Sequence, residues 1–164
     1  KEGRVVELVF YIDWSSFLLV NFFTENVDYE ISLLSSVPPW LKFLAELEKQ
    51  DISELNYIFC SDEYLLQINR QYLNHDFFTD IITFDNSERP NLVEGDIFIS
   101  LDRVRENSAI HQTTFFSELL RVIAHGLLHL VGYGDYDDKS KATMRKMEDK
   151  YLDLYFQSFH KADG

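Results

Sequence analysis

The sequence predicts an α+β fold, in which a small mixed four-stranded sheet is packed with about five helices. Three observations support this prediction. Segments with strand character dominate the first part of the chain, helical periodicity dominates the later part, and one helix of that later part is apolar on most of its surface. With 164 residues, of which 46% are hydrophobic, the chain can bury one core and is too short for two domains to be expected.

Four runs are predicted to form strands, because they are rich in β-branched and aromatic residues and are bounded by polar or turn-forming residues. They are residues 20–24, 55–60, 79–84 and 95–100. The last two runs are separated by a polar loop around Pro90, which suits a hairpin or a longer crossing.

Five helices are predicted from apolar residues that recur at spacings of three and four. They cover residues 40–50, 61 or 62 to about 73, 101–110, 115–131, and 138 to about 160. Pro38 and Pro39 start the first of them, since proline is tolerated in the first helical turn. Ser61 or Asp62 caps the second.

Residues 1–20 are expected to be an N-terminal extension of unknown role, and residues 21–164 a single domain. The extension is apolar and aromatic, but Glu7 and Asp13 interrupt it well before the roughly 18 uninterrupted apolar residues of a membrane span. No clean small-residue cleavage site follows the basic start, so a signal peptide is not expected either. We therefore expect no membrane partner.

The predicted helix 115–131 carries the residues that indicate chemistry. His125 and His129 are four residues apart, an offset of about 40° around a helix, so both imidazoles lie on one face. Gly132 and Gly134 allow the chain to turn sharply and return the carboxylate of Asp135 to the same place. Two histidines and a carboxylate without a fourth protein ligand are typical of a catalytic zinc with one open position. The metal site is thus expected at the end of a buried central helix.

Other interpretations of this segment remain open. Each histidine could be a core residue bonded to a carbonyl. A buried imidazole without any partner would cost roughly 1–3 kcal/mol of stability, and a shared metal would provide a partner for both rings. Asp137 and Asp138 compete as the third ligand, but both suit the start of the next helix. Gly126 stands where zinc peptidases of the His-Glu-x-x-His type have their glutamate base, which disfavours a peptidase.

The charge balance limits the ways in which the chain can bind nucleic acid. A formal charge of −13 and a pI near 4.6 disfavour indiscriminate phosphate binding. Any positive surface for RNA must therefore be local, unless the basic residues are simply solvated helix faces. The basic residues that bracket the histidine helix are Arg103, Arg105, Arg121, Lys139, Lys141, Arg145 and Lys146.

Four further residues have chemically capable side chains in less informative positions. Cys60 is the single cysteine, so it forms no internal disulfide; it is predicted to be a small core residue, and a reducing cytoplasm fits. His75 and His111 are expected in loops or on the surface. Asp80 is a candidate partner of a metal ligand, with a turn or strand-edge hydrogen bond as the simpler interpretation.

Three separated strings carry a family resemblance. HGLLHLVGYGD, INRQYLNHDFFTDIITF (68–84) and EGDIFISLDRV (94–104) resemble the YbeY family of bacterial endoribonucleases, and the likeness extends over residues 21–154. The resemblance implies a zinc-dependent, single-strand-specific RNase that matures ribosomal RNA, notably the 3′ end of the small-subunit RNA, and acts in ribosome quality control. The implied partners are precursor ribosomal RNA and the small subunit, with no DNA, in the cytoplasm.

Transferred by position, the family's ligand set falls on His125, His129 and Asp135, with one zinc ion as the expected cofactor. The family commonly has a histidine as the third ligand. A carboxylate oxygen is a harder ligand than imidazole, so the site is expected to favour zinc less strongly over other divalent ions. At the position after a tyrosine where the family often has an arginine, this sequence has Leu73. Arg70 on the same predicted helix is then a candidate for contacting phosphate, with a plain surface residue as the alternative interpretation.

The resemblance and the ligand set together suggest hydrolysis by metal-bound water, because zinc lowers the pKa of water toward about 7. Two other functions are kept as alternatives. One is a ribosome-associated assembly or binding protein with a structural metal. The other is a metallopeptidase-like hydrolase.

Overall fold

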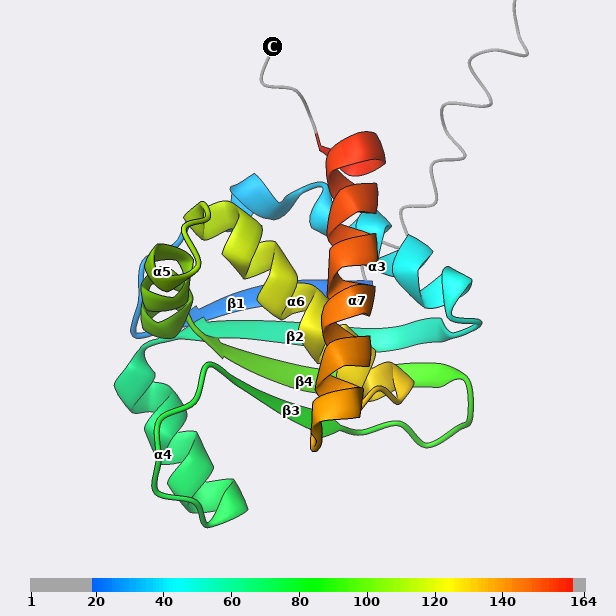
Figure 1. The fold of residues 1–164 in the computed structure, drawn as a ribbon. Helices are drawn as coiled ribbons and strands as arrows, with labels where there is room; N and C mark the ends of the chain where they lie inside the picture. Colours follow the sequence, from blue (N-terminus) through cyan, green and yellow to red (C-terminus); the bar gives the residue numbers. More distant parts are fainter. Residues whose placement is uncertain (1–18, 161–164) are drawn as a thin grey trace, which may run out of the picture.

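The structure, a computed structural model, describes residues 19–160 (Figure 1). Residues 1–18, and with them most of the expected extension 1–20, lie outside the described residues, as do residues 161–164. The predicted α+β fold with a mixed four-stranded sheet and five helices is confirmed. The elements are β1 (Val20–Glu25), α3 (Val37–Leu47), β2 (Asp51–Cys60), α4 (Asp62–Leu73), β3 (Ile81–Asp85), β4 (Leu92–Ser100), α5 (Leu101–Ile110), α6 (Phe115–Val131) and α7 (Asp138–Leu154).

The sheet has the strand order β1-β2-β4-β3. β1 pairs with β2, and β2 with β4, in parallel, whereas β3 and β4 are antiparallel and form the hairpin that was one of the two predicted options. The register places Tyr57 opposite Ile97, and Ile97 opposite Thr83. Because side chains alternate along a strand, these residues all face the same side of the sheet.

Helices cover the two faces of the sheet unequally. Figure 1 shows α6 and α7 crossing one face, with α4 set apart from them. The main core lies on the α6 side and includes Tyr57 and Ile97, both fully buried. A smaller cluster of Cys60, Leu65 and Ile82 lies under α4 on the opposite face. The histidine helix therefore packs on the larger apolar surface.

Two polar contacts join the buried helices to the strands and to each other. The hydroxyl of Tyr57 in β2 donates to the carbonyl of Ile123 in α6 at 2.9 Å. The indole of Trp40 in α3 donates to the carbonyl of Tyr151 in α7 at 2.8 Å. Both large side chains thereby satisfy their polar atoms inside the core.

Several element boundaries differ from the predicted ones. β2 starts at Asp51 and not at residue 55, because its first residues pair with Leu92 and Val93 of β4. The first helix starts at Val37, so its two prolines lie inside the first turn, and the short 3-10 helix Ile31–Leu34 was not predicted. α7 ends at Leu154 and continues as the π-helical turn Tyr155–Phe159, close to the predicted limit.

Between residues 19 and 160 no single helix is long and apolar enough to cross a membrane; only α5 and α6 taken together, bent by 117°, meet that test.

Candidate metal centre

Local sequence signals fix both ends of α6. The side chain of Thr114 caps the start of the helix by accepting a hydrogen bond from the Ser117 amide at 3.1 Å. Gly132, at φ 125°, ends it with a backbone conformation that side chains disfavour. The amides of Gly132 and Tyr133 both donate to the carbonyl of Leu128, at 3.1 and 3.0 Å. The chain consequently turns back across the end of the helix.

This turn brings the three predicted residues together. The imidazole rings of His125 and His129 have centroids 4.4 Å apart. Oδ2 of Asp135 lies 3.5 Å from Nε2 of His125 and 3.4 Å from Nε2 of His129. One ligand atom from each residue lies within 4.8 Å of the other two. The donor atoms therefore surround a common point.

The spacing of these donor atoms suits a tetrahedral metal ion. Zinc bonds of about 2.0–2.2 Å place neighbouring ligand atoms about 3.3–3.5 Å apart. Both nitrogen–oxygen distances, 3.5 and 3.4 Å, match that separation. Imidazole and carboxylate are also the ligand types that a zinc with one open position takes. The residues present thus fit a single divalent ion.

The competing acids, Asp137 and Asp138, serve the start of α7. The side chain of Asp137 accepts a 2.7 Å hydrogen bond from the Ser140 amide, and the Ser140 hydroxyl in turn accepts one from the Asp137 amide. The hydrogen bond from the Ser140 amide, followed by a contribution from the Ser140 side chain, lowers the pKa of Asp137. Asp138 lies in the first turn of the helix, where an acid is favoured.

Each histidine is held through the nitrogen that points away from Asp135. Nδ1 of His129 donates to the carbonyl of Tyr133 at 2.9 Å, and Nδ1 of His125 donates to Oε2 of Glu148 at 2.7 Å. With Nδ1 carrying the proton, Nε2 of each ring presents its lone pair toward Asp135. Such outer hydrogen bonds orient metal-binding histidines and raise their basicity.

Glu148 is the residue of this site that sequence reasoning missed. It is only 5% exposed, comes from α7, and its Oε1 also accepts a 3.0 Å hydrogen bond from Nη1 of Arg121. A signal was present, since Met144, Glu148 and Tyr151 form one face of the predicted helix. An acid within an apolar stripe indicates a buried partner for its charge.

Opposing effects set the electrostatics around His125. Burial lowers its pKa, but the hydrogen bond to Glu148 and the charges of Glu148, Asp135 and Asp80 outweigh burial, so the pKa is raised. Burial likewise lowers the pKa of Arg121, and its hydrogen bonds to Asp149 and Glu148 raise it overall. The negative charge beside His125 therefore favours a cation at this position, whether a proton or a metal ion.

The three donor groups open onto a cavity of about 380 Å³, whose other walls come from the start of β3 and the residues before it. The cavity is lined by Thr79, Asp80, Ile81, Thr83, His125, His129 and Asp135. Asp80 thus lies beside the site, while its backbone carbonyl accepts a 2.9 Å hydrogen bond from Ser100 at the edge of the sheet. The strand-edge hydrogen bond is the one that Asp80 forms, through its carbonyl; a role of its carboxylate beside a metal ligand stays a prediction.

The other candidates lie outside this cavity. Arg70 is exposed and forms an ion pair with Asp76, and Leu73 is partly exposed on the same helix. His75 stacks on Phe77, and His111 lies 3.6 Å from the buried carboxylate of Glu118.

The predicted basic cluster is partly neutralised by acids. Arg103 pairs with Asp62 at 3.0 Å, and Arg121 pairs with Glu148 at 3.0 Å and with Asp149 at 2.7 Å. Arg145 also lies 3.9 Å from Glu148. Three of the seven basic residues therefore have carboxylates beside them, which reduces the positive charge that they offer to phosphate.

Fold and site together define a class: α+β proteins in which a His-x-x-x-His helix on a small mixed sheet is followed by a glycine turn and an acid, so that three side chains that could hold a metal ion meet at a cavity. Within that class, the chain belongs to the YbeY family. The family model described as "Endoribonuclease YbeY" matches residues 21–155.

Individual relatives agree with the family model. A protein named "Endoribonuclease YbeY" from Cytophaga hutchinsonii is 55% identical over 135 residues, which cover 82% of this chain and 94% of the relative. One of the same name from Karelsulcia muelleri is 51% identical over 113 residues, covering 69% and 79%. The solution structure of TM1509 from Thermotoga maritima superposes with a TM-score of 0.61 at 27% identity, covering 88% of this chain and 97% of that one.

Proposed function

We propose that this protein is a zinc-dependent endoribonuclease that cleaves single-stranded precursor ribosomal RNA, notably at the 3′ end of the small-subunit RNA, and acts in ribosome quality control. The observation that carries the proposal is the convergence of His125, His129 and Asp135 at an open cavity, in a chain of the YbeY family. Residues 21–164 form the hydrolase domain in this proposal. A buried free thiol, Cys60, fits its placement in the cytoplasm.

In the proposed mechanism His125, His129 and Asp135 would hold one zinc ion. When bound, such an ion supplies Lewis-acid polarisation of a phosphoryl oxygen and water of lowered pKa. Glu148 and the Tyr133 carbonyl fix the two imidazoles in the required tautomer. Thr79 and Thr83 line the cavity wall. The Thr79 hydroxyl donates to the Ile81 carbonyl at 3.4 Å, so Thr83 is the threonine that can donate a hydrogen bond to a phosphate oxygen.

The two alternative functions fit the site less well. A structural zinc normally has four protein ligands, whereas the metal-binding group found among residues 19–160 has three. A zinc peptidase of the His-Glu-x-x-His type would need a base at position 126, where a Cβ atom would already come within 2.9 Å of the Ile97 side chain. Packing against the sheet therefore disfavours a glutamate there.

The decisive experiment compares Asp135→Ala with Asp138→Ala, a matched removal of a nearby exposed acid outside the cavity. We expect Asp135→Ala to lose both bound zinc and internal cleavage of an end-labelled single-stranded RNA, and Asp138→Ala to keep both. A metal-free Asp135→Ala protein that cleaves at the wild-type rate would refute the proposal.

Substrate class is tested separately. The wild type should cut a precursor of the small-subunit RNA near its 3′ end, and leave DNA of the same sequence and an unfolded protein intact. Products that end in a cyclic phosphate would assign the attack to the 2′-hydroxyl instead of water. Degradation of the unfolded protein would support the peptidase alternative.

A further inference from the structure

Exposed aromatic side chains are concentrated where α4 leads into β3. Tyr72 is 61% exposed, Phe77 56% and Phe78 48%, and Leu73 beside them is 39% exposed. Large apolar side chains that gather on a surface indicate a contact site, whereas isolated ones do not. This group, Tyr72 to Phe78, is called the aromatic loop below.

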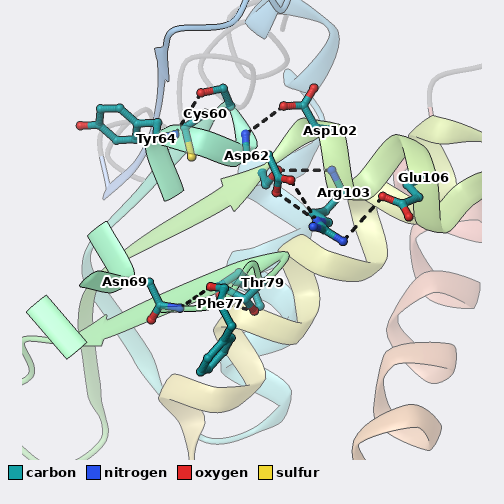
Figure 2. Close-up of polar contacts among 12 residues, drawn as sticks. Cys60, Asp62, Tyr64, Asn69, Phe77, Thr79, Asp102, Arg103 and Glu106 are labelled. Atoms are coloured by element: carbon teal, nitrogen blue, oxygen red, sulfur yellow. Dashed lines mark hydrogen bonds and ion pairs between the residues drawn. The ribbon is translucent and has the colours of Figure 1, made fainter. Parts of the chain in front are cut away.

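The aromatic loop has a fixed backbone. Asn69 in α4 is 1% exposed, and its side-chain amide donates to the carbonyl of Phe77 at 2.9 Å. The carbonyl of Asn69 accepts from the His75 amide at 3.1 Å. Figure 2 shows this bond to Phe77, whose ring extends away from Asn69. The exposed rings are thus presented from a backbone that is tied to a buried residue.

The same loop continues directly into the wall of the candidate metal centre. Thr79 and Asp80, the next residues, line the cavity with His125 and His129. Three residues span at most about 11 Å, which bounds the distance from the Cα of Phe77 to that of Asp80. A strand of RNA whose phosphate reaches the histidines consequently has its neighbouring nucleotides within reach of the rings.

Both phenylalanine rings already form a stacked contact on one side. Phe77 stacks on His75, with ring centroids 5.1 Å apart and an interplanar angle of 22°. The guanidinium of Arg103 lies 5.1 Å from the centroid of the Phe78 ring, and Figure 2 shows the same arginine paired with Asp62. Since each phenylalanine remains about half exposed, another planar group can extend either stack.

Charge around the loop favours stacking over phosphate attraction. Asp76, Asp80 and Asp135 place carboxylates on or beside the path to the centre. The nearby arginines, Arg70 and Arg103, are paired with acids. Stacking of bases on aromatic rings needs no net positive charge and tolerates any sequence.

We propose that Phe77 and Phe78 form a stacking platform that binds the bases of single-stranded RNA next to the phosphate held at the candidate metal centre. This inference rests on the proposed endoribonuclease function and adds the means by which an acidic protein holds its substrate. It also predicts that affinity for RNA falls only gently with rising salt, because few counterions are released.

The test measures binding of a short fluorescent single-stranded RNA, protected from cleavage by 2′-O-methyl and phosphorothioate groups, to the full-length zinc-loaded protein. Phe77→Leu with Phe78→Leu should weaken binding at least about 5-fold, the lower end for the loss of one stacked base. Tyrosine at both positions should restore it. Phe23→Leu is the matched control, because Phe23 is 50% exposed on β1 and does not line the cavity.

A second probe locates the stacked bases. An RNA that lacks one base but keeps its phosphates should bind the wild type more weakly at the positions beside the cleaved linkage. The double leucine variant should show no such further loss, because the base and the rings act as one pair. Undiminished RNA binding by the leucine variant would overturn the inference and leave the aromatic loop as a surface for a protein partner.

The outcome for the parent proposal is read separately, from zinc content and cleavage by the wild type and Asp135→Ala. If the wild type cleaves RNA and the leucine variant binds RNA normally, the stacking platform is refuted and the endoribonuclease proposal stands. If the wild type neither binds nor cleaves RNA, both are refuted.

Discussion

Nδ1 of His125 donates a 2.7 Å hydrogen bond to Glu148, a buried carboxylate 23 residues further along the chain. The bond joins α6, which carries the two histidines, to α7, which follows the turn with Asp135. Arg121, one turn before His125, holds the other oxygen of the same carboxylate at 3.0 Å. The orientation of His125 therefore depends on α7, a helix that supplies no candidate ligand itself.

Replacing Glu148 with glutamine should weaken zinc binding about 10- to 100-fold, the usual effect of losing a carboxylate behind a metal-binding histidine. The substitution keeps the shape of the side chain and removes its charge. Zinc affinity is measured by competition with a chelator. Asp149→Asn is the control, because Asp149 also pairs with Arg121 but its side chain is 55% exposed. Equal affinities of Glu148→Gln and wild type would contradict the role assigned to this bond.

The helix, the turn and the convergence of His125, His129 and Asp135 could be predicted from sequence because they depend on neighbours in the chain. A four-residue spacing and a glycine with positive φ fix their geometry locally. Glu148 was missed because its partner belongs to another helix. The first residues of β2 were missed for the same reason, since only pairing with Leu92 and Val93 makes them a strand.

Gly126→Ala should destabilise the protein by about 1–3 kcal/mol, the range for overpacking a core. A Cβ atom at this position would lie 2.9 Å from two atoms of Ile97 and 3.1 Å from Ile81. Helix propensity alone predicts the opposite sign, a gain of up to about 1 kcal/mol. Chemical denaturation of the wild type and of Gly126→Ala decides between the packing effect and the helix-propensity effect. A variant at least as stable as the wild type would show that α6 can shift away from the sheet.

Tyr133→Phe should cost about 0.5–1.5 kcal/mol of stability. The hydroxyl donates to Oε2 of Glu48 at 3.0 Å, and burial, followed by the hydrogen bond and charge of Glu48, raises its pKa. Since the carbonyl of Tyr133 holds His129, hydrogen exchange at the turn 132–135 should also become faster. Tyr136→Phe is the matched control, because Tyr136 is 85% exposed. Equal exchange in all three proteins would mean that the turn is held without Glu48.

Cys60 should resist alkylation in the native protein at pH 8 and react quickly once the protein is unfolded. Burial, and then the negative charges of Asp102, Asp62 and Glu25, raise the pKa of this thiol from 9.0 to about 12. Only the thiolate reacts, and at pH 8 it is about one part in ten thousand at such a pKa. Rapid native labelling would contradict the buried environment.

The same thiol gives stability a defined pH dependence. The unfolded chain releases the thiol proton near pH 9, whereas the folded protein keeps it until about pH 12. The contribution of Cys60 is therefore complete below pH 9 and is lost as the pH rises toward 12. The difference in unfolding free energy between wild type and Cys60→Ala should shrink over that interval, and a constant difference would show that the folded and unfolded thiols ionise alike.

The position of Glu148 in the chain also bears on synthesis. All four strands have been made once Ser100 has left the translating ribosome, and both histidines follow soon after. A polypeptide released between residues 136 and 147 would contain the four strands and every candidate ligand, but not the carboxylate that aligns His125. Premature termination in the part of α7 before Glu148 would accordingly yield a product that resembles the finished protein in its strands and lacks an aligned centre.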